Sequence, residues 1–77
     1  MTVDQLRRAQ QAHPFRPFTL QLADGTEVAV PHPEFMWMTP GGRTIFVATS
    51  DDAAQIIDTL LITAIRFGNH RPRRRNR

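Results

Sequence analysis

The sequence predicts a small, mainly β domain with one N-terminal α-helix, in which short strands form a strongly bent sheet or a barrel. Helix-start signals occupy the first residues, and apolar and polar residues then alternate with a period of two over residues 18–30. Turn residues recur after that at short, regular intervals. One helix followed by five or six short strands is typical of this architecture.

The first segment has the residues that begin a helix. Thr2 can cap it, and Gln5 stands at the reciprocal position of a capping box. Leu6 and Ala9 fall on one narrow apolar face. Pro14 ends the helix, because the residue before a proline is disfavoured in the α conformation. Residues 13–18 then form an extended linker into the first strand.

Residues 18–30 predict a β-hairpin whose register follows from its apolar positions. A three-residue loop over residues 23–25 places Leu20 opposite Val28, so that the apolar side chains of both strands share one face. A two-residue loop would place apolar residues opposite polar ones. We therefore prefer the longer loop, with Gly25 in the left-handed conformation that glycine adopts at little cost.

The rest of the chain predicts further short strands separated by turns. The prolines of residues 31–35 end the second strand in a sharp bend or a short helical turn. Strands are expected at residues 35–39, 43–49, 54–58 and 60–67, separated by turns at 40–42 and 50–53 and by a tight connection at 58–61. A chain of this length forms one domain, which we place at residues 1–69.

The net charge of +3 is unevenly distributed. Residues 1–70 contain five arginines and seven acids, which gives −2, whereas residues 71–77 contain five arginines and no acid. The basic character therefore belongs to the C-terminal tail, and we expect residues 70–77 to be a disordered arginine-rich segment. If the protein binds nucleic acid, its contacts come from Arg71, Arg73, Arg74, Arg75 and Arg77, with a secondary basic rim at Arg7 and Arg8.

Residues that could support catalysis are sparse. The chain has no cysteine, lysine or tyrosine, and its three histidines stand in unrelated contexts, so we expect no metal site and no cofactor. Asp51, Asp52 and Asp58 could act as paired carboxylates, but aspartates in turns more often cap the backbone. We therefore expect no enzymatic activity. No apolar run is long enough for a membrane span, and no signal peptide is evident, so we expect a cytoplasmic protein.

Residues 35–38 form a run of four large apolar residues in a chain that otherwise alternates. A strand that is apolar on both faces must be covered on both faces, and a domain this small has little material to cover the second. Two alternatives stay open, packing of the N-terminal helix or an interface with a second subunit. The predicted interface consists of Phe35, Met36, Trp37 and Met38.

The order of these elements resembles the Sm-like family and its bacterial Hfq branch. The resemblance is carried by the helix, the strand pair that turns at Asp24-Gly25, the bent sheet and the final strand with residues 61–65, LITAI. The chain also resembles small uncharacterised bacterial proteins with PFRPF, a DG turn, PHPEF and an IIDLLLIT-like ending. The Sm-like resemblance implies a small β-barrel, homo-oligomerisation and RNA binding. Asp58-Thr59 stand where Hfq presents a lysine–histidine pair.

Three function classes follow from these observations. The tail and the Sm-like resemblance favour a homo-oligomer that binds nucleic acid, RNA rather than DNA, with weak sequence preference. The acidic residues of the domain favour instead a protein-interaction or structural module, with an acidic protein as a partner for the tail. An enzyme is the third class, and no residue pattern supports it.

Overall fold

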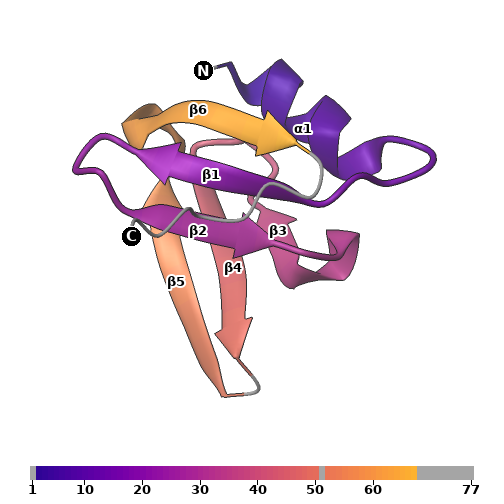
Figure 1. The fold of residues 1–77 in the computed structure, drawn as a ribbon. Coiled ribbons are helices and arrows are strands. Elements are labelled where there is room, and N and C mark those ends of the chain that lie inside the picture. The colour runs from indigo at the N-terminus through magenta and orange to yellow at the C-terminus, as the bar shows by residue number, and fades with distance from the viewer. Residues whose placement is uncertain (1, 51, 68–77) are drawn as a thin grey trace, which may run out of the picture.

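The computed structural model describes residues 2–50 and 52–67, which form one helix, six strands and two short 3₁₀ helices (Figure 1). Helix α1 spans Val3–Gln11 and is followed by strands β1 (Phe18–Leu22) and β2 (Glu27–Val30). The 3₁₀ helix η1 (Pro33–Phe35) leads into β3 (Met36–Met38), β4 (Thr44–Ser50) and β5 (Ala53–Asp58). A second 3₁₀ helix, η2 (Thr59–Leu61), leads into β6 (Ile62–Phe67).

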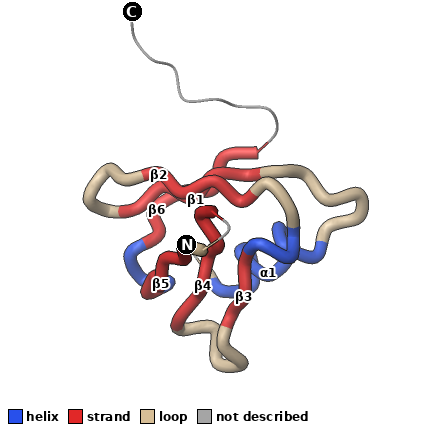
Figure 2. The backbone as a smooth tube through the Cα atoms, turned by 90° about the horizontal axis from the view of Figure 1, so that it is seen from below, coloured by secondary structure: helices blue, strands red, loops and turns tan. Residues whose placement is uncertain are grey.

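The strands form two three-stranded antiparallel sheets, β2-β1-β6 and β3-β4-β5, whose strands cross in Figure 1. The predicted mainly β fold with an N-terminal helix is confirmed, but the two sheets do not close into a barrel. No ladder joins the two sheets within the described residues. The physical reason lies at the two corners, where η1 and η2 turn the chain from one sheet into the other (Figure 2). Each 3₁₀ turn interrupts the strand pairing that a continuous bent strand would maintain.

Helix α1 begins and ends as its residues predict. Thr2 Oγ1 accepts a hydrogen bond from the Gln5 backbone N–H at 3.2 Å, and Gln5 Oε1 accepts one from the Thr2 N–H at 3.1 Å. Both halves of the capping box are therefore present. The helix buries Leu6 and Ala9 and ends at Gln11.

The hairpin has the predicted register. Phe18 pairs with Val30 and Leu20 with Val28, so the apolar residues of both strands face the core. Gly25 has a φ of +91°, which confirms the left-handed position in the loop. Asp24 Oδ1 accepts a hydrogen bond from the Thr26 N–H at 2.9 Å, and this bond holds the pKa of the Asp24 carboxyl below its usual value.

The core lies between the two sheets and under α1. The inward residues alternate along the strands, as the burial of Leu20, Leu22, Ile45 and Val47 shows. Helix α1 also lies close to the turn between β3 and β4. A Cβ added to Gly42 in this turn would lie 3.0 Å from Val3 Cγ2 and closer still to Val3 Cγ1. The buried apolar residues are Leu6, Ala9, Phe18, Leu20, Leu22, Val28, Val30, Met36, Ile45, Val47, Ile57 and Ile62.

Candidate nucleic-acid interface

The two arginines predicted on the helix have different surroundings. Arg7 is half-buried, and its Nη2 donates to the sulfur of Met38 in β3 at 3.4 Å. Arg8 is exposed in the last turn of α1, where a cation interacts favourably with the negative end of the helix dipole. Arg8 is therefore the residue of this pair that is available to an external anion.

The two described arginines beyond the linker, Arg43 just before β4 and Arg66 in β6, are engaged with carboxylates. Arg43 pairs with Asp58 at 3.4 Å, and Arg66 pairs with Glu27 at 3.4 Å. Within residues 2–50 and 52–67, no such ion pair involves Arg7, Arg8 or Arg16. In the described part of the chain, the positive charge that no neighbouring acid neutralises thus lies on α1 and on the linker that follows it.

A groove of about 470 Å³ opens between α1, the linker and β6. Its lining is mainly apolar and carries two arginines at its edge. The residues that line it are Gln5, Arg8, Ala9, Ala12, Arg16, Ile65 and Phe67. The guanidinium carbon of Arg16 lies 5.0 Å from the centre of the Phe67 ring, a cation–π arrangement.

The arginines of the tail, Arg71, Arg73, Arg74, Arg75 and Arg77, lie outside the described residues, as does the rest of residues 68–77. Their predicted role in binding stays a prediction. The chain enters this segment directly after Phe67, which lines the groove. The described part of the chain therefore ends at the groove that Arg8 and Arg16 line.

The four residues of the predicted subunit interface do not share one environment. Phe35 ends η1 and is half-buried, Met36 is only 2% exposed and belongs to the core, and Met38 contacts Arg7. Trp37 alone of the four points outward, with 57% of its surface exposed. The interface stays a prediction in which Trp37 would supply most of the contact.

Helix α1 covers part of this same segment. The side-chain amide of Gln10 donates to the backbone oxygens of Pro33 and Met36, which fixes the helix against η1 and β3. The alternative in which the helix packs against residues 35–38 therefore holds for Met36 and Met38. It does not hold for Trp37, which packs instead on Phe46 of β4 with ring centres 5.2 Å apart.

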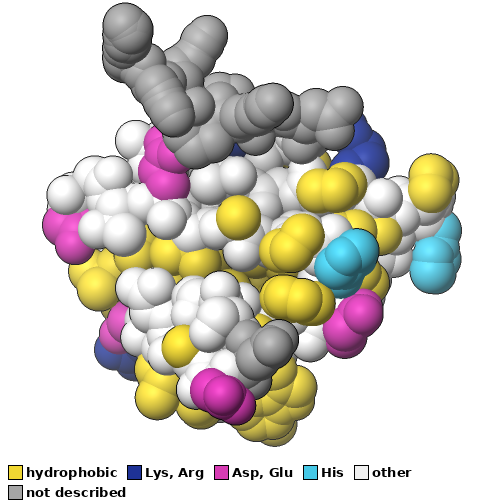
Figure 3. All heavy atoms as spheres, turned by 60° about the horizontal axis from the view of Figure 1, so that its bottom comes forward, with side chains coloured by type: hydrophobic (Ala, Val, Ile, Leu, Met, Phe, Trp, Pro, Cys, Tyr) yellow, Lys and Arg dark blue, Asp and Glu magenta, His cyan; other side chains and the backbone are white. Residues whose placement is uncertain are grey.

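Trp37 belongs to an apolar row on the outer face of the β3-β4-β5 sheet. Trp37 pairs with Phe46, and Phe46 pairs with Ile56, which is 66% exposed. Hydrophobic side chains also gather along the lower rim of the molecule in Figure 3. The sequence pattern did not single out Ile56, although its alternation with the buried Ile57 was the available signal.

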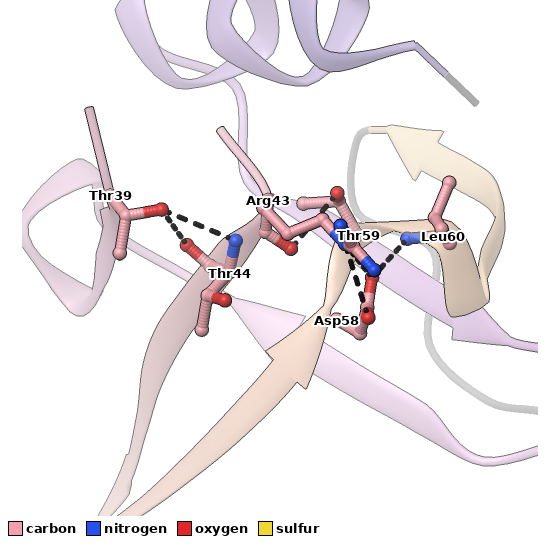
Figure 4. A network of polar contacts seen from close by, with 6 residues as sticks. All are labelled: Thr39, Arg43, Thr44, Asp58, Thr59 and Leu60. Atoms are coloured by element: carbon pink, nitrogen blue, oxygen red, sulfur yellow. Dashed lines mark hydrogen bonds and ion pairs between the residues drawn. The ribbon is translucent and has the colours of Figure 1, made fainter. Parts of the chain in front are cut away.

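The aspartate at the second corner acts on the backbone. Asp58 Oδ1 accepts a hydrogen bond from the Leu60 N–H at 2.9 Å and so caps η2, while Arg43 approaches the same carboxylate (Figure 4). The Leu60 N–H, and secondarily the charge of Arg43, hold the pKa of Asp58 below its usual value. Thr59 Oγ1 donates to the Arg43 carbonyl oxygen at 3.1 Å. The Asp58 carboxylate is therefore engaged in the turn, and the turn interpretation of Asp51 and Asp52 stays a prediction.

The remaining candidate residues that the structure describes form no cluster. His13 and His32 are exposed, and the His32 ring packs on Phe35 at 5.4 Å. In the part of the chain that the structure covers, no group of three His, Cys, Asp or Glu residues could hold a metal ion. Asp52 is exposed, and Asp51 and His70 lie outside the described residues. The described residues include no helix that is long and apolar enough to cross a membrane.

Comparison with family models, curated proteins and solved structures finds no significant match to this chain. The class of protein is therefore defined by its architecture, a small domain with an N-terminal helix followed by antiparallel strands.

The sequence missed the groove between α1 and β6. The local signal for the groove is a pair of small residues, Ala9 in the helix and Ala12 just after it. They are three positions apart and so lie on one side of the helix. Small side chains there leave a hollow beside a neighbouring strand. Arg16 was assigned to a linker because its partner across the groove, Phe67, is about 50 residues away in the sequence.

Proposed function

We propose that this protein is a non-enzymatic, Sm-like homo-oligomer that binds RNA or another nucleic acid, mainly through its arginine-rich tail and with weak sequence preference. The observation that carries the proposal is the distribution of unneutralised charge. Among the described arginines, Arg43 and Arg66 are paired with acids, whereas Arg7, Arg8 and Arg16 are not. Arg8, the exposed one of the two helix arginines, would add a phosphate contact to those proposed for Arg71, Arg73, Arg74, Arg75 and Arg77.

The arrangement of the elements supports the Sm-like part of the proposal. An N-terminal helix precedes a bent set of antiparallel strands, and the last strand, β6, returns through a 3₁₀ turn to pair with the first strand, β1. The resemblance in the order of elements and in residues 61–65 points in the same direction. The open sheets leave β2, β3, β5 and β6 as edges, and edge strands pair readily with a second chain.

Guanidinium groups in this arrangement would contact phosphates rather than base edges. Phosphate contacts position a protein on nucleic acid but carry no sequence information, which is why the sequence preference should be weak. They also release counterions, so affinity for a single strand falls with salt by a slope of about 0.7 per phosphate contact in a double-logarithmic plot. Tails on several subunits of one oligomer would act on the same strand and raise the apparent affinity.

The test is a fluorescence-anisotropy titration of a labelled single-stranded RNA over a series of salt concentrations. The full chain is compared with a variant that carries glutamine at all five tail arginines, which keeps the length of the chain. The variant should bind much more weakly and with a flatter salt dependence. Arg43→Gln is the matched control, because Arg43 is already paired with Asp58 and should contribute little. Equal affinity and an equal salt slope for the tail variant would refute the role of the tail.

The second candidate function is a protein-interaction or structural assembly module that does not bind nucleic acid. The observation that favours it is the apolar row on one sheet face, in which Trp37 and Ile56 are exposed and Phe46 is half-buried between them. Native mass spectrometry of the full chain and of Trp37→Ser tests this candidate. Oligomers that dissociate in the Trp37→Ser variant, together with no RNA binding at low salt, would favour assembly over nucleic-acid binding. Monomers alone at micromolar concentration would exclude the homo-oligomer in both candidates.

A further inference from the structure

We propose that the groove between α1 and β6 is a binding site for a small aromatic anion, a flat apolar body that carries one acidic group. The site does not depend on the proposed nucleic-acid function, because its specificity comes from the groove and not from the tail. Three independent features of the groove carry the inference: its size, the nature of its polar groups and the aromatic wall that β6 supplies.

The size of the groove suits a small organic molecule. Its volume of about 470 Å³ lies within the range of about 300–1,000 Å³ that is usual for small-molecule sites. The hollow exists because the helix side carries only Ala9 and Ala12 at this place, while Ile65 and Phe67 form the opposite side. These four side chains make an apolar interior that an apolar body can fill.

The polar groups of the groove are donors. Arg8 and Arg16 stand on the lining, and neither forms an ion pair within the described residues. The side-chain oxygen of the third polar residue, Gln5, accepts a hydrogen bond from the Thr2 N–H, and its amide N–H₂ group is a further donor. No carboxylate lines the groove among residues 2–50 and 52–67. An apolar interior beside two guanidinium groups that no described carboxylate neutralises is complementary to an anion and not to a cation.

The wall formed by Phe67 favours an aromatic body over a flexible aliphatic one. Phe67 is 42% exposed, and its ring packs edge-on against Phe18, whose ring centre is 6.0 Å away and which is buried. The ring is therefore supported from behind and presents surface to the groove. Arg16 already lies over this ring at 5.0 Å, so its guanidinium is positioned beside the surface on which an aromatic ligand would pack.

The test uses two fluorescent probes that share one apolar body. 8-Anilinonaphthalene-1-sulfonate carries a sulfonate, and N-phenyl-1-naphthylamine is the same body without it. Both are titrated into the full chain under native conditions. The sulfonate should bind saturably and at least about tenfold more tightly than the uncharged probe, which corresponds to one charge-assisted contact. Equal affinities would overturn the proposal.

Three variants assign the binding to the groove. Arg8→Gln combined with Arg16→Gln should weaken the sulfonate about tenfold and leave the uncharged probe unchanged. Ala12→Leu fills the hollow and should abolish binding of both probes, although it leaves every arginine of the chain in place. Arg43→Gln removes an arginine that does not line the groove and should change neither affinity. Sulfonate binding that survives Ala12→Leu would place the probe elsewhere, on the tail or on the Trp37 face, and would overturn the proposal.

A measurement on the unsubstituted chain tests the same site without depending on whether the variants fold. In two-dimensional NMR spectra, the sulfonate should shift the backbone amide signals of Ala9, Ala12 and Ile65, while those of Phe46 and Ile56 on the opposite sheet should stay in place. Shifts confined to the latter pair would refute binding in the groove.

Adenosine 5′-monophosphate and adenosine form a second pair of probes, which distinguishes a nucleotide from other aromatic anions. If the nucleotide competes with the sulfonate for the groove, the acidic group of the ligand is a phosphate. If the nucleotide does not compete, the acidic group is a sulfonate or a carboxylate.

Discussion

The three glycines of the two turns offer a graded test of the fold when each is replaced by alanine. Gly25 has a φ of +91° and no atom within 4 Å of an added Cβ, so Gly25→Ala meets backbone strain alone. Gly42 has a φ of +78°, and an added Cβ would also collide with Val3 of α1. Gly41 has open space and no positive φ, which makes it the matched control.

The expected losses in the free energy of unfolding follow from these surroundings. An L-residue in the left-handed region costs about 1–2 kcal/mol, which sets the loss for Gly25→Ala. Gly42→Ala has the same strain plus an overpacking cost of about 1–3 kcal/mol, because Val3 has little room to retreat. The buried Leu6 and Ala9 and the two hydrogen bonds of Gln10 hold the helix in place. Gly41→Ala should stay within about 0.5 kcal/mol of the parent.

The assay is denaturant unfolding followed by circular dichroism, with the slope against denaturant checked for constancy. A double-mutant cycle of Gly42→Ala with Val3→Ala isolates the collision, because shortening Val3 removes the atoms that the new Cβ meets. The two substitutions should couple by about 1 kcal/mol or more, with the double variant more stable than the sum of the single losses predicts. A Gly42→Ala loss no larger than that of Gly25→Ala, or no coupling to Val3, would refute the packing of α1 on this turn.

Two further predictions concern polar contacts at the ends of helices. Thr2→Ala should lower the free energy of unfolding by about 1 kcal/mol through loss of the cap, whereas Thr2→Ser should retain it, and equal stability of both variants would contradict the capping box. Asp58 has a folded-state pKa below its usual value of 3.8, so its contribution to stability is present above that value and is lost as the pH falls through the lower folded pKa. The free energy of unfolding should therefore fall below about pH 4, and by less in Asp58→Asn. An identical pH dependence for Asp58→Asn would show that Leu60 and Arg43 do not act on this carboxylate.

Local signals predicted much of the fold because they depend on neighbours in the sequence. The capping box of Thr2 and Gln5, the register set by Leu20 and the left-handed position of Gly25 each involve residues a few positions apart. The proline-rich stretch also gave the short helical turn η1, since a proline at its first position leaves no donor unpaired. These elements are fixed by the chain itself, and tertiary packing only preserves them.

Features that depend on contacts between distant segments could not be predicted from the sequence. Whether two bent sheets close into a barrel depends on the distance between the edge strands that the turns η1 and η2 connect. No residue pattern predicts that distance. The same holds for residues 35–38, which look uniform in sequence but alternate in space, with Met36 inward and Trp37 outward. The groove was missed because its two sides, Ala12 and Phe67, come from opposite ends of the described chain.

The pairing of β1 with β6 has a consequence for the order in which the domain folds. Phe18 pairs with Phe67, whereas β3, β4 and β5 follow one another through short turns. Closing a chain segment of about 50 residues costs about 2 kcal/mol more in entropy than closing one of about five. We therefore expect the β3-β4-β5 meander to form before β6 docks on β1. Because β6 also forms one wall of the groove, the ligand site comes into existence only in this last step of folding.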